Sequence, residues 1–525
     1  MGASVRIAEG HPLRTPLRNN EPQSQTAQVV SLPAPVGGWN ARDSIAAMPP
    51  LDAVVMDNWF PDTDYVKLRN GYANHVTGIT GQVETLMQYS SGTTRKMFAA
   101  ATTAIYDVTS AGAVGAAVVT AQTNARWQHV NFGTSGGQFL ILCNGADVPQ
   151  NYNGTVWATT PAITVATPAS LIHVNVFKTR LFFIEKNSMK AWYLPVASIG
   201  GAAAALDFSS VCRLGGSLTA MATWSIDGGT GIDDYAVWIT SEGEVIIYRG
   251  TDPSAAATWA LVGVYRMGRP IGRRCFFKIG SDVVFITTDG FVLLSKAMLS
   301  DRTQPQIALS DKIVNVANLA ANTYGVNFGW QPILYPKGKM GIFNVPITEG
   351  TTAHQYVMNT QTGAWCRFTG WNANCWELYD ENIYFGTNGK VCKADTGSVD
   401  DTNNISADVK QAYSYFNAPG RLKRFTMARP VMLSDGIPAV SIIMNVDFED
   451  QNVLSEPSYS GASGSLWNVA TWDVSLWAGA LTPKKTWQSL FSVGYAGSYR
   501  MKSVSKNILI QWAATDIVME YGGVI

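Results

Sequence analysis

A repeated hairpin pattern between Gly81 and Gly397 narrows the folds open to this chain. In each unit an apolar strand is followed by a polar turn containing Gly or Asn and then by a second strand. Six such hairpins can be written out: MFAAATTAIYDVTS from Met97, FLILCNGADVPQNYNG from Phe139, LFFIEKNSMKAWYLP from Leu181, YAVWITSEGEVIIYRG from Tyr235, VVFITTDGFVLLSKA from Val283 and NIYFGTNGKVCKADTG from Asn382. Most starts lie roughly 40 to 55 residues apart, the spacing typical of propeller blades. The sequence therefore predicts an all-β chain whose main body is a β-propeller of about six blades.

The interval between the fifth and sixth hairpins is about twice as long as the others. It holds further hairpin material, GIFNVPITEGTTAHQYVMNTQTGAWCRF, from Gly341 to Phe368. A blade with an insertion and a seventh blade both fit this interval.

The regions outside the repeat differ in character. Residues 1–28 have no periodicity and are rich in Pro, Asn, Gln and Ser, which predicts a flexible N-terminal arm. We place the propeller at 80–400 and, after the polar run SVDDTNNISADVK, a strand-rich C-terminal β domain at 401–525. Within that domain Trp467, Trp472 and Trp477 recur every five residues, which indicates aromatic packing under a loop.

The charge composition excludes a strongly basic protein. Hydrophobic residues make up 46% of the chain and charged residues 14%, and 38 Lys and Arg balance 38 Asp and Glu. A neutral chain has no global field with which to grip DNA phosphates. No segment has the length and apolarity of a membrane span, and none resembles a secretion signal.

Two short motifs are typical of hydrolases, but their surroundings argue against catalysis. Gly133, Ser135 and Gly137 match G-x-S-x-G, yet the following residues QFLILCNG predict a strand, whereas a nucleophile elbow needs a helix there. Asp395, Thr396 and Gly397 form a single D-T-G, whereas aspartic proteases need two carboxylates that share a proton. Asp and Gly are also favoured in turns for conformational reasons alone.

The remaining chemistry-bearing residues form no known catalytic or metal set. The carboxylate pairs Asp62 with Asp64 and Asp233 with Asp234 have the residue type that glycoside hydrolysis uses, but adjacency in sequence does not give the required separation. The chain contains no HExxH, Walker A or dinucleotide-binding glycine motif and no His/Cys cluster with metal-ligand spacing. We therefore expect no catalytic residues, no metal and no cofactor.

One stretch, DVKQAYSYFNAPGRLKRFTMARP, combines positive charge with aromatic residues. Its candidate site, termed the basic cluster, consists of Lys410, Arg421, Lys423, Arg424 and Arg429. Such a pattern is typical of nucleic-acid surfaces, and a solvated or subunit-facing strand explains it equally well.

The segment from Pro35 to Tyr72, PVGGWNARDSIAAMPPLDAVVMDNWFPDTDYVKLRNGY, resembles the opening of tail nozzle and packaged-DNA stabilisation proteins of short-tailed bacteriophages. The matching positions are Gly37, Gly38, Asn40, Asp57, Asn58, Trp59, Phe60, Pro61, Arg69, Gly71 and Tyr72. Further stretches look similar to the same family: Glu242 to Gly272, Tyr356 to Trp371, YFNAPGRLKRFTMARP and ILIQWAATDIVMEYGG. The segment 29–79 is accordingly expected to be a family-signature region that packs on the propeller.

The resemblance implies a structural virion protein rather than an enzyme. Such a subunit forms a ring, usually a hexamer, below the portal and adaptor of the head-to-tail connector, retains packaged double-stranded DNA and opens for its ejection. Tail fibres or a tail needle are further implied partners, and the implied location is the virion tail after assembly in the host cytoplasm. Two alternatives remain open: a tail-associated polysaccharide-degrading enzyme and a cellular β-propeller interaction module.

Overall fold

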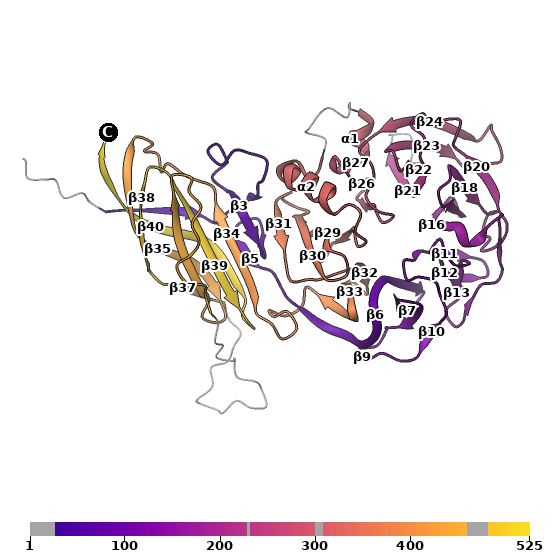
Figure 1. The fold of residues 1–525 in the computed structure, drawn as a ribbon, viewed down its shortest axis with the longest axis horizontal. Helices are drawn as coiled ribbons and strands as arrows, with labels where there is room; N and C mark the ends of the chain where they lie inside the picture. Colours follow the sequence, from indigo (N-terminus) through magenta and orange to yellow (C-terminus); the bar gives the residue numbers. More distant parts are fainter. Residues whose placement is uncertain (1–26, 228–231, 300–307, 459–480, 525) are drawn as a thin grey trace, which may run out of the picture.

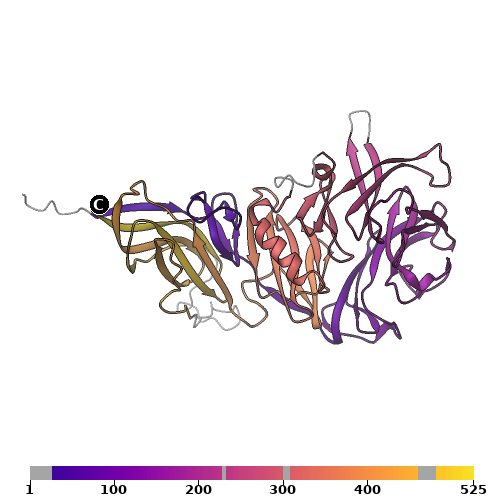
Figure 2. The ribbon, with the colours of Figure 1, turned by 45° about the horizontal axis from the view of Figure 1, so that its top comes forward.

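The computed structural model describes residues 27–227, 232–299, 308–458 and 481–524. Trp467, Trp472 and Trp477, for which aromatic packing was predicted, lie outside these ranges, as does nearly all of the N-terminal arm. The described chain is elongated, with a ring of small sheets at one end and the C-terminal sheets at the other (Figure 1). Seen from a second direction, the same two lobes remain distinct (Figure 2).

Four antiparallel sheets of the ring stand alone as propeller blades, and in each sheet the strands are hydrogen-bonded in the order in which they follow along the chain. The first three are β11 (Gln128–Thr134), β12 (Gly137–Cys143), β13 (Gln150–Tyr152) and β14 (Trp157–Ala158); β16 (Leu171–Phe177), β17 (Arg180–Glu185), β18 (Lys190–Tyr193) and β20 (Ala204–Asp207); and β21 (Leu218–Asp227), β22 (Ile232–Thr240), β23 (Glu244–Gly250) and β24 (Trp259–Arg266). The fourth is β25 (Phe276–Ile279), β26 (Asp282–Thr287) and β27 (Gly290–Leu293). A small parallel pair, β15 (Ile163–Thr164) with β19 (Gly201–Ala202), joins neighbouring blades.

Apolar side chains fill the spaces between neighbouring blades. One cluster joins β16–β18 to β21–β24, with Phe182, Trp238 and Trp259 at its centre. Another joins β21–β23 to β25–β27 through residues such as Val237 and Phe285. Face-to-face packing of successive meanders is the arrangement of a β-propeller, so the predicted fold class is confirmed.

The predicted number of about six blades is wrong, because the described residues form four separate blades. Two further meanders merge into larger sheets. The first of these sheets contains β6 (Tyr72–Ser91), β7 (Thr94–Ala101), β8 (Ala104–Asp107), β9 (Gly112–Ala113), β10 (Ala117–Val119), β32 (Cys375–Tyr379) and β33 (Asn382–Ala394). The meander β6–β8 and the hairpin β32–β33 merge because β6 is 20 residues long and bends at Gly78 and Gly81, both at positive φ. Its first half pairs with β33 and its second half with β7.

The sixth predicted hairpin, from Asn382, is likewise a single strand. Residues 382–386 of β33 pair with β32, and residues 388–394 pair with β6. The Asn-Gly at 388–389, part of the predicted hairpin, instead lies at a register shift within one strand: Asn388 pairs with Gln82 and Lys390 with Thr77, both of β6.

The second merged sheet has nine strands and runs from the propeller into the C-terminal domain. Its order begins β28 (Gln331–Tyr335), β29 (Met340–Thr348), β30 (Thr352–Asn359), β31 (Trp365–Phe368) and β3 (Asp52–Asp57), and continues β34 (Ile405–Gln411), β39 (Gly497–Ser505) and β36 (Ala439–Val446), with β2 (Gly38–Trp39) beside β3. The additional hairpin material at 341–368 forms β29, β30 and β31. Strand β3 therefore connects the two lobes.

The C-terminal domain also contains a seven-stranded sheet. It consists of β37 (Thr482–Lys485), β35 (Arg421–Ser434), β40 (Ile510–Val524), β5 (Val66–Leu68), β4 (Trp59–Pro61), β1 (Gln28–Pro33) and β38 (Gln488–Gly494). The segment 29–79, expected to pack on the propeller, supplies β1 and β5 as direct partners of β40. It contacts the propeller through β3 and β31.

Two short helices lie beside the nine-stranded sheet and the last blade: α1 (Leu294–Leu299) and α2 (Val314–Tyr324). One apolar core includes Ala320 of α2, Phe343 of β29, Trp365 of β31 and Trp512 of β40. The two lobes therefore share a core. Within the described ranges no helix has the length and apolarity needed to cross a membrane.

Acid is expected to weaken the propeller through His173. This side chain is buried on β16, and its Nε2 lies 3.0 Å from the carbonyl oxygen of Met221 on β21. Its pKa is lowered to about 4, chiefly by burial and in smaller part by the charge of Arg273, while the hydrogen bond with Met221 opposes the shift. The unfolded chain, with a His pKa of about 6.5, takes up the proton first, so stability is complete above about pH 6.5 and falls as pH decreases toward 4.

Urea unfolding at pH 7 and pH 4.5 checks this expectation. Between these pH values the wild type should lose about 2 kcal/mol more unfolding free energy than His173→Gln, whose amide keeps a donor for Met221. Equal losses in the two proteins would show that His173 is not the titrating group.

Candidate functional site: the joint between propeller and C-terminal domain

The basic cluster is largely neutralised within the chain. Lys410 is buried on β34, and its Nζ lies 3.1 Å from a carboxylate oxygen of Asp450. Arg429 lies 2.5 Å from Asp516, and this hydrogen bond lowers the pKa of the Asp516 carboxyl. The guanidinium of Arg429 also lies over the ring of Trp487.

Lys423 and its neighbours on β35 complete the cluster. The Lys423 ammonium is fully buried and donates to the carbonyl oxygens of Ala418, Arg421 and Tyr495, at 2.6, 2.9 and 2.7 Å. Burial lowers the pKa of this lysine. Arg424 is exposed, 3.9 Å from Glu520, and Arg421 lies over the ring of Tyr521. Most of the cluster therefore holds the C-terminal sheets together, and a contact of Arg421 and Arg424 with DNA or a neighbouring subunit stays a prediction.

The two hydrolase-like motifs both lie in turns. Ser135 lies in the hairpin turn between β11 and β12, where two strands meet and no helix follows. Asp395 follows the end of β33 at φ 53°, and its carboxylate accepts a hydrogen bond of 2.9 Å from Asn70. Burial raises the pKa of this carboxyl. The predicted strand after Ser135 is present as β12, and the position of Asp395 agrees with the turn interpretation of D-T-G.

One carboxylate of each sequence pair, Asp234 and Asp62, has a partner of opposite charge. Asp234 lies 2.5 Å from Lys178 and accepts a hydrogen bond from Ser225. Asp62 is 3.8 Å from Lys67. Asp233 lies on β22 opposite Ile226. Among the described residues no group of three His, Cys, Asp or Glu side chains could hold a metal ion.

The residues that carry the family resemblance gather at the joint between the lobes. Arg69 is their centre, with a side chain that is 1% exposed. Its Nη1 and Nη2 donate to the two carboxylate oxygens of Asp400, at 2.8 and 2.6 Å. Its remaining donors reach the Asn58 side chain and the carbonyl oxygens of Asn70 and Thr369. All five guanidinium donors are thus used, which is the arrangement that stabilises a buried arginine.

Two further signature residues near Arg69, Asn58 and Gly71, are closely packed against neighbouring segments. Asn58 adopts φ 60°, and its amide donates to Thr369 and to the carbonyl oxygen of Ser406. A Cβ on Gly71 would lie 1.8 Å from the carbonyl oxygen of Val399. Only glycine fits this close approach between the segment before β6 and the segment before β34.

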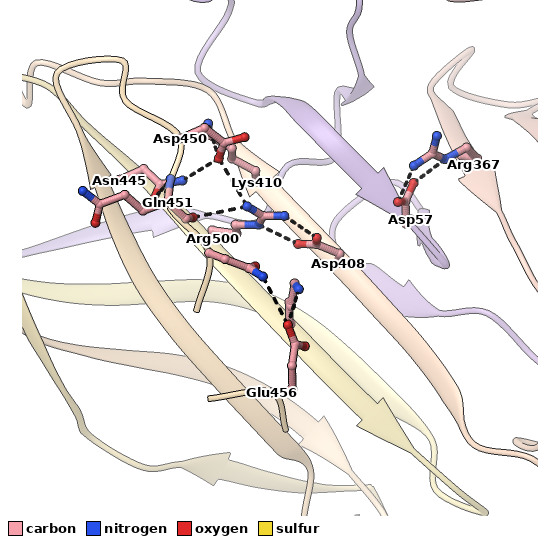
Figure 3. Close-up of polar contacts among 11 residues, drawn as sticks. Asp57, Arg367, Asp408, Lys410, Asn445, Asp450, Gln451, Glu456 and Arg500 are labelled. Atoms are coloured by element: carbon pink, nitrogen blue, oxygen red, sulfur yellow. Dashed lines mark hydrogen bonds and ion pairs between the residues drawn. The ribbon is translucent and has the colours of Figure 1, made fainter. Parts of the chain in front are cut away.

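A row of four charged side chains crosses the joint, from β31 over β3 and β34 to β39, with an arginine at each end and two aspartates between them (Figure 3). Arg367 donates two hydrogen bonds to Asp57, of 2.7 and 2.5 Å. Arg500 donates two to Asp408, of 3.0 and 2.7 Å. Asp57 and Asp408 lie directly opposite each other in the register. Each carboxylate needs its own arginine, because facing like charges destabilise a sheet.

The arginines in this row respond to their partners. The hydrogen bond to Asp408 raises the pKa of Arg500. For Arg367 burial lowers the pKa, but the hydrogen bond and charge of Asp57 outweigh it and the net direction is upward. These hydrogen bonds of Arg367 and Arg500 fix β3 between the propeller and the C-terminal domain.

Comparisons with known proteins add only distant structural likenesses. No protein-family model and no curated protein matches the sequence. The structure of BBS1N in complex with ARL6DN is 9% identical, with a TM-score of 0.39, over 62% of this chain and 96% of that chain. The β-propeller domain of Cps50 (Swd1) from Myceliophteria thermophila is 10% identical, with a TM-score of 0.38, over 61% and 98%. YCF48 bound to D1 peptide is 9% identical, with a TM-score of 0.34, over 67% and 99%.

The assignment of fold comes from the strands of this chain itself. Separate antiparallel meanders, packed face to face in a ring, define the propeller. The chain is a β-propeller protein whose N-terminal and C-terminal segments together complete a second β domain.

Proposed function

We propose that the chain is a non-enzymatic assembly subunit that acts through protein contacts, and specifically the nozzle of a short-tailed bacteriophage tail. The observation that carries the proposal is the position of the signature residues Asn58 and Arg69, which meet Asp400 and Thr369 at the joint. A motif that serves to lock two domains together supports a mechanical role.

The rigid joint is suited to a ring subunit. A continuous sheet and a shared core connect the lobes, so a load on one lobe reaches the other without a flexible linker. A subunit that surrounds a pressurised genome needs this stiffness. Zero net charge also suits a channel through which double-stranded DNA must slide without being held.

In this proposal identical subunits, six by the family resemblance, form a ring below the adaptor of the head-to-tail connector. DNA passes along the ring axis, and tail fibres or a needle attach outside it. The ring belongs to the virion tail and assembles in the host cytoplasm. Pairing of Asp234 with Lys178 and Ser225 favours a structural role for this carboxylate over glycan hydrolysis.

A cellular β-propeller interaction module is the second candidate, and the propeller fold itself favours it. Many propellers present their rims and faces to partner proteins. In the solved structures described above, BBS1N is in complex with ARL6DN and YCF48 is bound to D1 peptide. On this candidate the chain works as a monomer that captures one partner.

Mass photometry and electron microscopy of the purified full chain, with and without the adaptor protein of the same genome, separate the two candidates. The nozzle predicts closed rings of subunits once the adaptor is added. A chain that remains monomeric with the adaptor would contradict the nozzle and leave the interaction module.

A further inference from the structure

The propeller surrounds a cavity on its axis. Two adjoining hollows, of about 260 and 340 Å³, share the side chains of Gln128, Arg273 and Arg274. The first strand of each successive meander contributes to the larger hollow: Leu86 of β6, His129 of β11, Asn175 of β16, Thr223 of β21, Lys278 of β25 and Gln331 of β28. Cavities of this combined size accept small molecules and are far too small for a DNA duplex.

The lining of this axial cavity is positively charged. Its ionisable side chains, apart from two histidines, are Arg126, Lys186, Arg273, Arg274 and Lys278. Neither hollow has an Asp or Glu among its described lining residues. Burial lowers the pKa of His173 to about 4, so this histidine adds no charge at neutral pH. In a chain with zero net charge, such a concentration of one sign is a local feature.

The carboxylates close to the cavity are already paired. Glu84 and Glu349 both bind Arg126, at 3.0 and 2.8 Å. Glu377 lies 3.3 Å from His129. Asp234, whose negative charge acts on Lys278, forms its ion pair with Lys178. None of these groups offsets the charge of the remaining cations through direct contact.

Arg274 holds the inner strands together. It donates to the carbonyl oxygen of Glu84 at 2.9 Å, to Thr85 Oγ1 at 2.6 Å and to the carbonyl oxygen of Trp127 at 2.9 Å. These acceptors are neutral, so the positive charge persists, and burial lowers the pKa of this arginine. The position of Arg274 joins β6, the start of β11 and the segment before β25.

Arg273 and Lys278 have more free donors. Among the described residues Arg273 donates only to the carbonyl oxygen of Asn144, at 3.3 Å. Lys278 donates to the hydroxyl of Thr223. Burial lowers the pKa of both side chains, which is the cost of placing cations here without a counter-charge. An anion in the cavity would remove that cost.

We propose that the axial cavity binds a small anion with phosphate or carboxylate groups, held by Arg273 and Lys278 against the wall formed by Arg274. Guanidinium and ammonium donors form charge-assisted hydrogen bonds with both kinds of oxyanion. The site lies inside each propeller and is separate from any channel between subunits. It does not depend on the nozzle function.

Isothermal titration of the full chain at low salt tests the site, with inorganic pyrophosphate and citrate as separate probes. We expect one-to-one binding of at least one probe. Tighter binding of pyrophosphate assigns a phosphate-bearing ligand, and tighter binding of citrate assigns a carboxylate-bearing one. Failure of both probes to bind at millimolar concentration would overturn the proposal.

Variants locate the binding. Arg273→Gln and Lys278→Gln should each lower the affinity for the probe by about tenfold, since each removes a charge-assisted hydrogen bond. Arg424→Gln removes an exposed arginine in the C-terminal domain and should leave the affinity unchanged. Melting curves without probe confirm folding, and Lys278→Gln carries the test if Arg273→Gln does not fold. If Arg424→Gln lowers the affinity equally, the effect follows from the total charge of the chain and not from the cavity, which would overturn the proposal.

Discussion

Replacing Arg69 with Met is expected to destabilise the chain by about 3 to 5 kcal/mol, because Asp400 then remains buried without its counter-ion. Asp400 is 7% exposed and receives both terminal guanidinium nitrogens of Arg69. The substitution also leaves the carbonyl oxygen of Thr369 without its 2.6 Å donor. The free energy of unfolding in urea measures the loss.

Two companion variants make this test specific. Arg69→Met combined with Asp400→Leu should recover part of the loss, because both buried charges are then removed. Arg424→Met, at a side chain that is 69% exposed, should change stability by no more than about 0.5 kcal/mol. If Arg69→Met unfolds at the same urea concentration as the wild type, the joint does not depend on this ion pair.

The second large effect is expected at Trp59. This side chain is fully buried on β4 and meets Trp512 of β40 edge to face, with ring centroids 6.1 Å apart. Trp59→Ala should cost about 3 to 5 kcal/mol, because it opens a cavity in the core that the two lobes share. Urea unfolding followed by circular dichroism measures the change.

A double-mutant cycle separates the contact of the two rings from burial alone. The coupling between Trp59→Ala and Trp512→Ala should be about 0.5 to 1.5 kcal/mol, the contribution of an aromatic pair. Trp487→Ala, at a half-buried ring in the same domain, serves as the matched control and should cost less. Additive losses at Trp59 and Trp512 would show that the rings contribute only by burial.

Local patterns in the sequence were sufficient for the propeller. Hairpins such as the one from Leu181 form β17 and β18 because alternation of apolar residues and the turn chemistry are encoded within about 15 residues. The blade count failed for a different reason: β6 pairs with β33, whose residues lie about 300 positions later. No local pattern identifies a strand with two partners.

The candidate site was obscured by the same separation. Asp450 and Asp516, which neutralise Lys410 and Arg429, follow their partners by 40 and 87 positions, so the basic cluster suggested a free surface. Arg69 and Asp400 are 331 positions apart. In the sequence, only its place in the signature segment marked Arg69 as a candidate, and the fold was needed to identify Asp400 as its partner. The cations of the axial cavity come from several meanders and share no sequence motif.

The central proposal is that this chain is the nozzle of a short-tailed bacteriophage tail. Cryo-electron microscopy of the virion whose genome encodes the chain tests it most directly. The account predicts a ring of these propellers, each joined to its C-terminal domain, directly below the adaptor and around the DNA channel. A tail whose density contains no copy of this chain would contradict it.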